Sequence, residues 1–215
     1  AALQLLMNVK PECVSAAARA CLSAEVLRIA GRDQEASSVA RTVVDKLSTD
    51  SPREDIRRGA IILQKLGLIG EALSLWKRLV QTESVGADTL RAVECAHRCG
   101  DIQYILALSS GLRANGIWER RIFELELTYR AEYNDSATEV AILQEFIDHP
   151  LDVSYLPQAR LRLSVAGIRT GREELIENDP LKLPRVTDVS ASLGMHVVEV
   201  LRRGQRSEEH TSELQ

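Results

Sequence analysis

The feature that most constrains this sequence is a series of residues that can end a helix in the left-handed conformation and that recur at nearly constant intervals. Gly31, Gly67, Gly100, Asn134 and Gly171 follow one another at intervals of 36, 33, 34 and 37 residues. Glycine has no Cβ that resists a positive φ, and asparagine tolerates it better than most other residues. Because helices commonly end at such a residue, the spacing predicts a repeated unit of two helices with the turn residue between them.

Apolar residues between these turns recur three and four positions apart, which is the spacing of a helix that buries one face. The segments with this pattern are 17–30, 56–66, 72–80, 90–99, 102–112, 117–133, 140–147 and 156–168. Aromatic residues make up only 4% of the chain, whereas the strong helix formers Ala, Leu, Arg and Glu are frequent throughout. The sequence therefore predicts an all-α fold of antiparallel helix pairs.

Small residues lie where the two helices of a pair must approach each other. Ala36 and Ala72 come five residues after a turn, and Ala24 and Ala60 come seven residues before one. Small side chains let helix axes come within roughly 8–10 Å. Larger apolar residues, which we expect to fill the space between neighbouring pairs, are Val43, Trp76, Leu79, Leu112, Leu143 and Phe146.

The stretch from Leu66 to Leu79, with Gly67 at the turn, Ala72 and Trp76, resembles the centre of a tetratricopeptide repeat. Repeats of that family have a period of about 34 residues. The resemblance covers residues 12–177 and implies a right-handed α-solenoid. The sequence departs from the family's pattern at Ile105 and Glu139, where a small residue is usual, and in the aromatic residue expected early in the first helix, which only Phe123 supplies. These departures leave open another kind of helix-pair repeat.

We assign residues 1–177 to the helical repeats, because the helical pattern changes after residue 177. Prolines at 180 and 184 interrupt helix formation, so residues 178–205 are interpreted as a capping segment of the repeats or as the start of a further, truncated domain. Residues 206–215 resemble the conceptual translation of a common sequencing adapter. That resemblance implies that this tail is artefactual and that the natural protein continues beyond Gln205, so we exclude the tail from the search for sites.

Composition and charge exclude several classes of partner. The formal net charge of −4 disfavours a nucleic-acid-binding protein with a uniformly basic surface. The sequence has no apolar run near the roughly 20 residues that span a bilayer, so we expect no membrane partner. It also shows no secretory signal pattern, which leads us to expect a cytoplasmic protein.

Residues with reactive side chains do not form a recognisable catalytic or metal-binding motif. Cys95 and Cys99 lie four residues apart with His97 between them, but Cys13 and Cys21 are far away, and zinc sites usually use closely spaced cysteine pairs. We interpret the four cysteines as small apolar packing residues. The sequence also lacks phosphate-binding, zinc-protease and serine-hydrolase motifs. We therefore expect no enzymatic activity, cofactor or metal from this chain.

The resemblance to tetratricopeptide repeats implies that the first helix of each pair lines a concave groove that binds a partner. Counting back from each turn residue assigns ten residues to this surface: Glu25, Arg28, Arg57, Gln64, Lys65, Glu94, His97, Arg98, Glu124 and Thr128. The same counting adds Ile29 and Ile61, so the surface is mixed in charge and partly apolar, as suits a peptide or a segment of another protein. We expect a non-catalytic protein-interaction scaffold. The alternative is the repeat region of a larger enzyme or nucleic-acid-acting protein whose catalytic domain is missing here.

Overall fold

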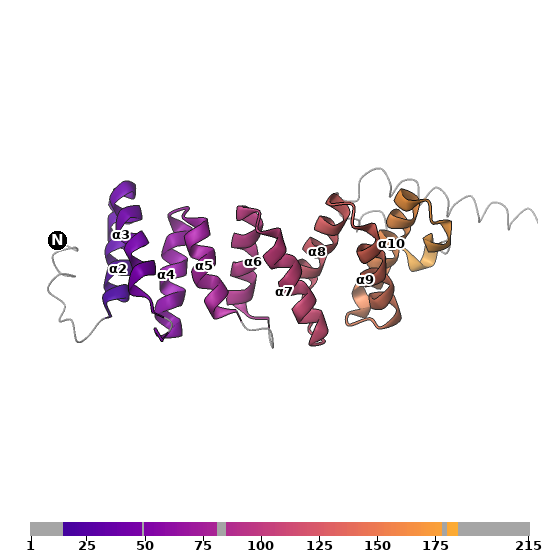
Figure 1. Cartoon of the computed structure of the whole chain (residues 1–215), viewed down its shortest axis with the longest axis horizontal. Helices are drawn as coiled ribbons and strands as arrows, with labels where there is room; N and C mark the ends of the chain where they lie inside the picture. The colour runs from indigo at the N-terminus through magenta and orange to yellow at the C-terminus, as the bar shows by residue number, and fades with distance from the viewer. Residues whose placement is uncertain (1–14, 49, 81–84, 178–179, 185–215) are drawn as a thin grey trace, which may run out of the picture. The chain divides into compact units, whose positions relative to one another are not determined.

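The computed structural model describes residues 15–48, 50–80, 85–177 and 180–184, and within these ranges it consists of helices and the turns between them (Figure 1). The α-helices are α2 Ala16–Ile29, α3 Asp33–Lys46, α4 Arg53–Lys65, α5 Ile69–Leu79, α6 Ala87–Cys99, α7 Ile102–Ala114, α8 Arg120–Glu132, α9 Ser136–Asp148 and α10 Leu156–Thr170. Short 3-10 helices are η2 Val153–Tyr155, η3 Glu173–Leu175 and η4 Pro180–Lys182. The predicted all-α class is confirmed for the described residues.

All five predicted turn residues have the left-handed backbone conformation. Their φ angles are 72° at Gly31, 76° at Gly67, 70° at Gly100, 56° at Asn134 and 70° at Gly171. After each of them, the next amide N–H donates to the carbonyl five residues earlier, which is the closing bond of a Schellman motif. These bonds give hydrogen-bond donors to carbonyl groups at the helix ends. The predicted turn residues therefore lie where helices end.

Gly116 forms a sixth turn of this kind, with φ of 67°, that the spacing did not predict. It ends α7 and therefore separates consecutive pairs instead of the two helices within one pair. At Gly171 the prediction was wrong in part, because the described chain beyond it forms the 3-10 helices Glu173–Leu175 and Pro180–Lys182 instead of a second α-helix. Ile176 has an extended backbone, with φ of −83° and ψ of 120°, so the chain leaves the helical conformation before it reaches Pro180.

The described residues fall in two compact units, divided between Ile122 and Phe123, and α8 crosses the division. In the first unit, residues 1–122, the helices contact each other in the order of a repeat: α2 with α3, α4 with α5, and α6 with α7. Neighbouring pairs contact through α3 with α4 and α5 with α6. The predicted small residues Ala24, Ala36, Ala60 and Ala72 are completely buried, as close helix contacts require.

Equivalent helices of the first two pairs lie side by side and run in the same direction. The Ser15 hydroxyl at the start of α2 donates to Asp55 at the start of α4 at 2.7 Å, and Lys65 near the end of α4 donates to Glu25 of α2 at 3.0 Å. Both contacts join residues 40 positions apart, so α2 and α4 are parallel and in register. This arrangement makes one continuous surface of two first helices.

In the second unit, residues 123–215, the described helices pack around aromatic residues and buried charges. The rings of Phe123 in α8, Phe146 in α9 and Tyr155 in η2 lie 5.3–5.8 Å apart, with Tyr155 edge-on to both phenylalanines. Glu139 of α9, at a position where the resemblance led us to expect a small residue, is buried and forms an ion pair with Arg169 of α10. The departure from the repeat pattern is thus accommodated by an opposite charge on the neighbouring helix.

Three parts of the sequence interpretation lie outside the described residues. These are Cys13, most of the segment 178–205, of which only 180–184 are described, and the adapter-like residues 206–215.

Candidate partner-binding surface

The ten residues assigned to the partner surface are all at least partly exposed and all lie on first helices of the pairs. Glu25 and Arg28 are on α2; Arg57, Gln64 and Lys65 are on α4; Glu94, His97 and Arg98 are on α6; Glu124 and Thr128 are on α8. The first eight belong to the first unit, whereas Glu124 and Thr128 belong to the second. The surface is therefore treated separately in each unit.

Glu25 connects α2 and α4 through a three-residue charge cluster. One of its carboxylate oxygens lies 3.1 Å from the guanidinium of Arg28 and 3.0 Å from the ammonium of Lys65. Hydrogen bonds from these two cations lower the pKa of Glu25, so the carboxylate is ionised at neutral pH. Two cations share one carboxylate, which leaves the cluster with one excess positive charge.

Arg57 is more constrained than its prediction as an accessible groove residue implied. Its guanidinium donates two hydrogen bonds to Asp88 of α6, at 2.9 and 2.8 Å, and one to Glu54 at 2.8 Å. The bonds from Arg57 hold the pKa of Asp88 below its ordinary value. A bidentate pair of this kind fixes the position of one helix relative to the next. Arg57 therefore joins consecutive pairs and is a poor choice as a freely available partner contact.

The α6 part of the surface is open to solvent. Glu94, His97 and Arg98 are exposed, and Glu94 pairs loosely with Arg91 at 3.7 Å. In the second unit, the Thr128 hydroxyl donates to the carbonyl oxygen of Glu124 at 2.7 Å, which is a contact within α8 itself. This bond uses the hydroxyl of Thr128 locally and leaves it less suited to contact a partner.

Between α2 and α4 the surface is hollowed. The hollow has a volume of about 230 Å³ and is lined by Ala18, Cys21, Leu22, Glu25, Arg58, Ile61, Ile62 and Lys65. Leu22 is 47% exposed and Ile61 is 38% exposed, although both are aliphatic. Counting back from the turns found Glu25, Ile61 and Lys65 but missed Leu22 and Arg58. Their positions follow only once α2 and α4 are known to be parallel and in register.

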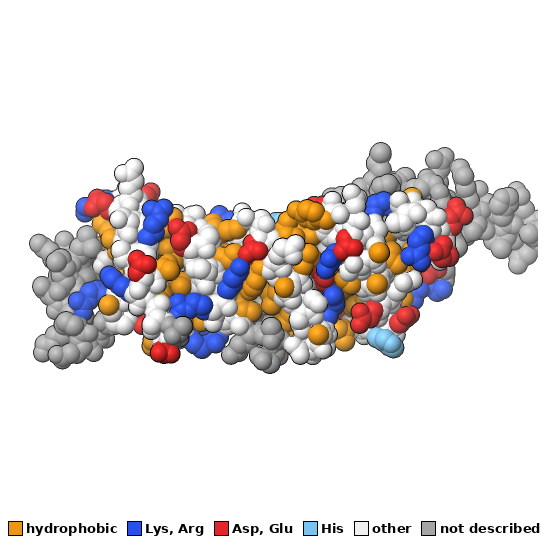
Figure 2. Space-filling view, in the orientation of Figure 1, with side chains coloured by type: hydrophobic (Ala, Val, Ile, Leu, Met, Phe, Trp, Pro, Cys, Tyr) orange, Lys and Arg blue, Asp and Glu red, His pale blue; other side chains and the backbone are white. Residues whose placement is uncertain are grey.

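Charged side chains of both signs, Glu25, Arg58 and Lys65, line this hollow, and the rest of the unit's surface is similarly mixed. Figure 2 shows Lys and Arg side chains interspersed with Asp and Glu over the helices of the first unit, with apolar side chains visible between them. Two of these cations have carboxylate partners outside their own helix: Arg41 of α3 pairs with Glu71 of α5, and Lys77 of α5 pairs with Asp101, which precedes α7. The described surface of this unit is thus mixed in charge instead of uniformly basic.

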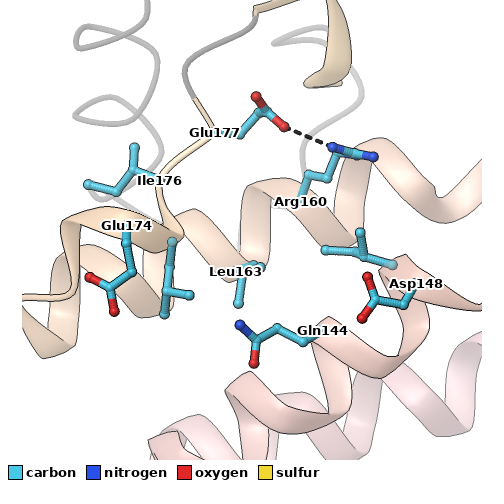
Figure 3. Close-up of a pocket in the computed structure, with 9 residues that line it drawn as sticks. Gln144, Asp148, Arg160, Leu163, Glu174, Ile176 and Glu177 are labelled. Atoms are coloured by element: carbon cyan, nitrogen blue, oxygen red, sulfur yellow. Dashed lines mark hydrogen bonds and ion pairs between the residues drawn. The ribbon is translucent and has the colours of Figure 1, made fainter.

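A second, larger hollow of about 620 Å³ lies in the second unit (Figure 3). It is lined by Gln144, Ile147, Asp148, Arg160, Leu163, Glu174, Leu175, Ile176 and Glu177. Figure 3 shows Arg160 and Glu177 joined across one side of it by an ion pair of 2.8 Å. No His, Cys, Ser or Thr is among these lining residues. Its ionisable lining residues are instead Asp148, Arg160, Glu174 and Glu177.

The described cysteines are free thiols that pack among apolar side chains, apart from the exposed Cys99. Burial raises the pKa of both Cys21 and Cys95 to about 11, which makes their thiols poor nucleophiles and metal ligands at neutral pH. Among the described residues, no three His, Cys, Asp or Glu side chains are grouped so that they could hold a metal ion.

Comparison of the chain with known protein families, with characterised proteins and with solved structures found no significant match. The arrangement of helices is repeat-like, with contacts between consecutive helices. No described helix is both long enough and apolar enough to cross a membrane.

Proposed function

We propose that this chain is a non-catalytic scaffold that binds a peptide or a segment of another protein on the surface formed by the first helices of its pairs. We further propose that these pairs continue as a right-handed superhelix of the tetratricopeptide type. In such an array each unit contacts its neighbours, so that equivalent helices present one extended surface. The proposal concerns α2, α4 and α6, which belong to the same unit.

The observation that supports a binding role best is the exposure of aliphatic side chains on two parallel first helices. Leu22 and Ile29 of α2 are 47% and 72% exposed, and Ile61 of α4 is 38% exposed. Leu22 and Ile29 are seven residues apart and so lie on the same face of α2. A single exposed aliphatic residue is ordinary, but several on one hollowed surface with a polar surround are typical of an interaction site.

The charges on this surface favour a protein partner over nucleic acid. A nucleic-acid surface needs an uninterrupted row of cations that can face phosphates. Here Arg28 and Lys65 share Glu25, and Arg57 is held by Asp88 and Glu54. Alternating charges of both signs instead favour recognition of one particular protein segment and discriminate against others.

A displayed random peptide library, selected on the whole chain, tests the proposal. Peptides enriched on the chain are then measured against a first-helix variant with Lys65→Glu, Glu94→Lys and Arg98→Glu. We expect affinity to fall by about ten-fold or more, which corresponds to about 1.4 kcal/mol.

The matched control changes exposed residues of the second helix α3, with Arg41→Glu, Asp45→Lys and Lys46→Glu, and alters the net charge by the same amount. This variant should bind the selected peptides as the unaltered chain does. The proposal fails if no peptide is enriched, or if the α3 variant loses binding while the first-helix variant keeps it.

A further inference from the structure

The hollow between α2 and α4 combines a buried apolar base with exposed apolar sides. Ala18, Cys21 and Ile62 are each at most 6% exposed, whereas Leu22 and Ile61 are 47% and 38% exposed. An apolar group seated between Leu22 and Ile61 would remove both side chains from water. The surface therefore gains most from an aliphatic ligand group at this point.

The size of the hollow indicates which kind of ligand group fits. Its volume of about 230 Å³ is below the roughly 300–1,000 Å³ of most small-molecule and cofactor sites. One aliphatic side chain of a peptide needs far less room than a cofactor. The hollow thus suits a single anchoring side chain, with the rest of the peptide lying along the helices.

The charges around the hollow differ between its two ends. At the end where α2 and α4 finish, Arg28 and Lys65 share the single carboxylate of Glu25. At the end where the helices begin, Asp55 accepts a hydrogen bond from Ser15. Arg58 lines the hollow and is paired with Glu54 on its own helix. Among side chains in direct ion pairs, the excess positive charge therefore lies at the C-terminal end of the two helices, where the charge of Asp33 also acts on Arg28 without forming an ion pair with it.

Resting on the proposed function, we infer that this hollow binds a peptide through an aliphatic side chain that has an Asp or Glu beside it. The aliphatic side chain lies between Leu22 and Ile61, and the acidic side chain contacts Arg28 and Lys65. A lysine ammonium has three donors and the guanidinium of arginine has five, so both retain N–H groups for a second carboxylate beside Glu25. The partner's acid satisfies the excess charge of the cluster.

Glu25 competes with the partner for the same two cations. Its side chain is 29% exposed, and ion pairs near the surface contribute little net free energy. A carboxylate from the peptide can therefore bind beside Glu25 or displace it at low cost. Removing the charge of Glu25 should strengthen binding of acidic peptides in particular.

The first test changes the apolar part of the hollow. The probe is the set of peptides selected on the whole chain, whose sequences should share an aliphatic residue close to an Asp or Glu. Leu22→Ser with Ile61→Ser should lower their affinity by about ten-fold or more. The matched control is Leu151→Ser with Val153→Ser, two aliphatic residues that are 50% and 70% exposed elsewhere and should not affect binding.

The second test changes the charge. Glu25→Gln should increase the affinity for a selected acidic peptide several-fold, because Arg28 and Lys65 lose their internal partner. The same peptide with its acidic residue changed to the corresponding amide should show no such increase. A variant that fails to fold would lose affinity, so an increase in affinity cannot result from misfolding of Glu25→Gln.

The outcomes separate this inference from the proposed function. Peptides that bind α4 and α6 but ignore Leu22, Ile61 and Glu25 leave the scaffold proposal intact and overturn the inference. Failure to select any peptide overturns both. A concentration-dependent dimer in sedimentation that Leu22→Ser and Ile61→Ser dissociate would show that a second copy of the chain covers the hollow, and this too overturns the inference.

Discussion

The two units of this chain pack their helices by different physical means. In the first unit, close helix contacts are made by completely buried alanines such as Ala36 and Ala72, and the only polar residues buried among those described are Thr89 and Ser109. In the second unit the described residues bury three charged side chains, Glu126, Glu139 and Arg162, beside a cluster of aromatic rings.

This difference teaches where each unit is vulnerable. A core packed from small and apolar residues tolerates changes of surface charge. It is strongly destabilised when a substitution removes buried side-chain volume. Buried charges are costly unless each has a partner, so the second unit depends on specific pairs. Substitutions that remove buried volume should therefore destabilise the first unit most. Substitutions that remove the partner of a buried charge should destabilise the second unit most.

The largest effect is expected from Trp76→Ala in α5. Trp76 is 1% exposed, and its indole N–H has no hydrogen-bond partner among the described residues, so its contribution is packing alone. Removing the ring should lower the free energy of unfolding by about 3–5 kcal/mol. Trp76→Phe keeps most of the apolar surface and should cost less than half as much. Urea unfolding followed by circular dichroism measures both, and a loss below about 1 kcal/mol for Trp76→Ala would contradict the packing account.

Arg169→Met should have the next largest effect, because it leaves the carboxylate of Glu139 buried without its ion-pair partner. We expect a loss of about 2–4 kcal/mol, below the full value for a buried pair since the Arg169 side chain is 27% exposed. Adding Glu139→Leu should restore most of the loss. The control is Arg172→Met, whose pair with Glu174 is exposed and should contribute less than about 0.5 kcal/mol. Equal losses for Arg169→Met and Arg172→Met would remove the distinction between buried and surface pairs.

The sequence predicted the helix ends and the close contacts better than it predicted the surface. A glycine at a turn or an alanine at a helix contact answers a local backbone or steric requirement, which spacing along the chain can locate. Helix α3 illustrates the limit. Its buried residues Ala36, Ala40 and Val43 have helical spacing, but they are few in a mostly polar segment, and the segments predicted from apolar periodicity did not include this helix.

Contacts between repeats depend on which helices become neighbours, and periodicity does not contain that information. Counting back from Gly67 assigned Arg57 to the open surface. Its pairing with Asp88, which lies 31 positions away on a different helix, could not be read from that spacing. The pair of Glu139 and Arg169 likewise became visible only once α9 and α10 were placed together. Leu22 was missed because its exposure results from the alignment of α2 with α4.

A smaller effect should distinguish two neighbouring glycines of the first unit. Gly67 has φ of 76°, which an L-residue adopts at a cost, whereas Gly70 has open space around it inside α5. Gly67→Ala should lower the free energy of unfolding by about 1 kcal/mol, and Gly67→Val by at least as much. Gly70→Ala should instead raise it by about 0.4–1 kcal/mol, because alanine restricts the unfolded chain. Urea unfolding of the three variants measures these changes from the unfolding midpoints, provided that the dependence of the free energy on urea concentration is unchanged. An unchanged midpoint for Gly67→Val would contradict the turn assignment.

The smallest effect concerns pH, and it should have opposite sign in the two units. Burial raises the pKa of Glu139 above its ordinary value of 4.5, whereas hydrogen bonds from Arg57 hold the pKa of Asp88 below its ordinary value of 3.8. Native Glu139 therefore binds its proton more tightly than the unfolded chain does. Its ionisation lowers stability as pH rises above 4.5, and that stability returns on acidification. Ionised Asp88 stabilises the fold above 3.8, and this contribution is lost as pH falls through its lowered pKa.

Glu139→Gln and Asp88→Asn remove these ionisations and so report them by difference. The free energy of unfolding of the unaltered chain, relative to Glu139→Gln, should rise as pH is lowered from about 7 toward 4.5. Relative to Asp88→Asn, it should fall as pH is lowered further, below 3.8. Urea unfolding in small pH steps measures both differences for the same preparations. Because burial dominates at one carboxylate and a cation dominates at the other, two differences that change in the same direction would show that the units do not treat charge differently.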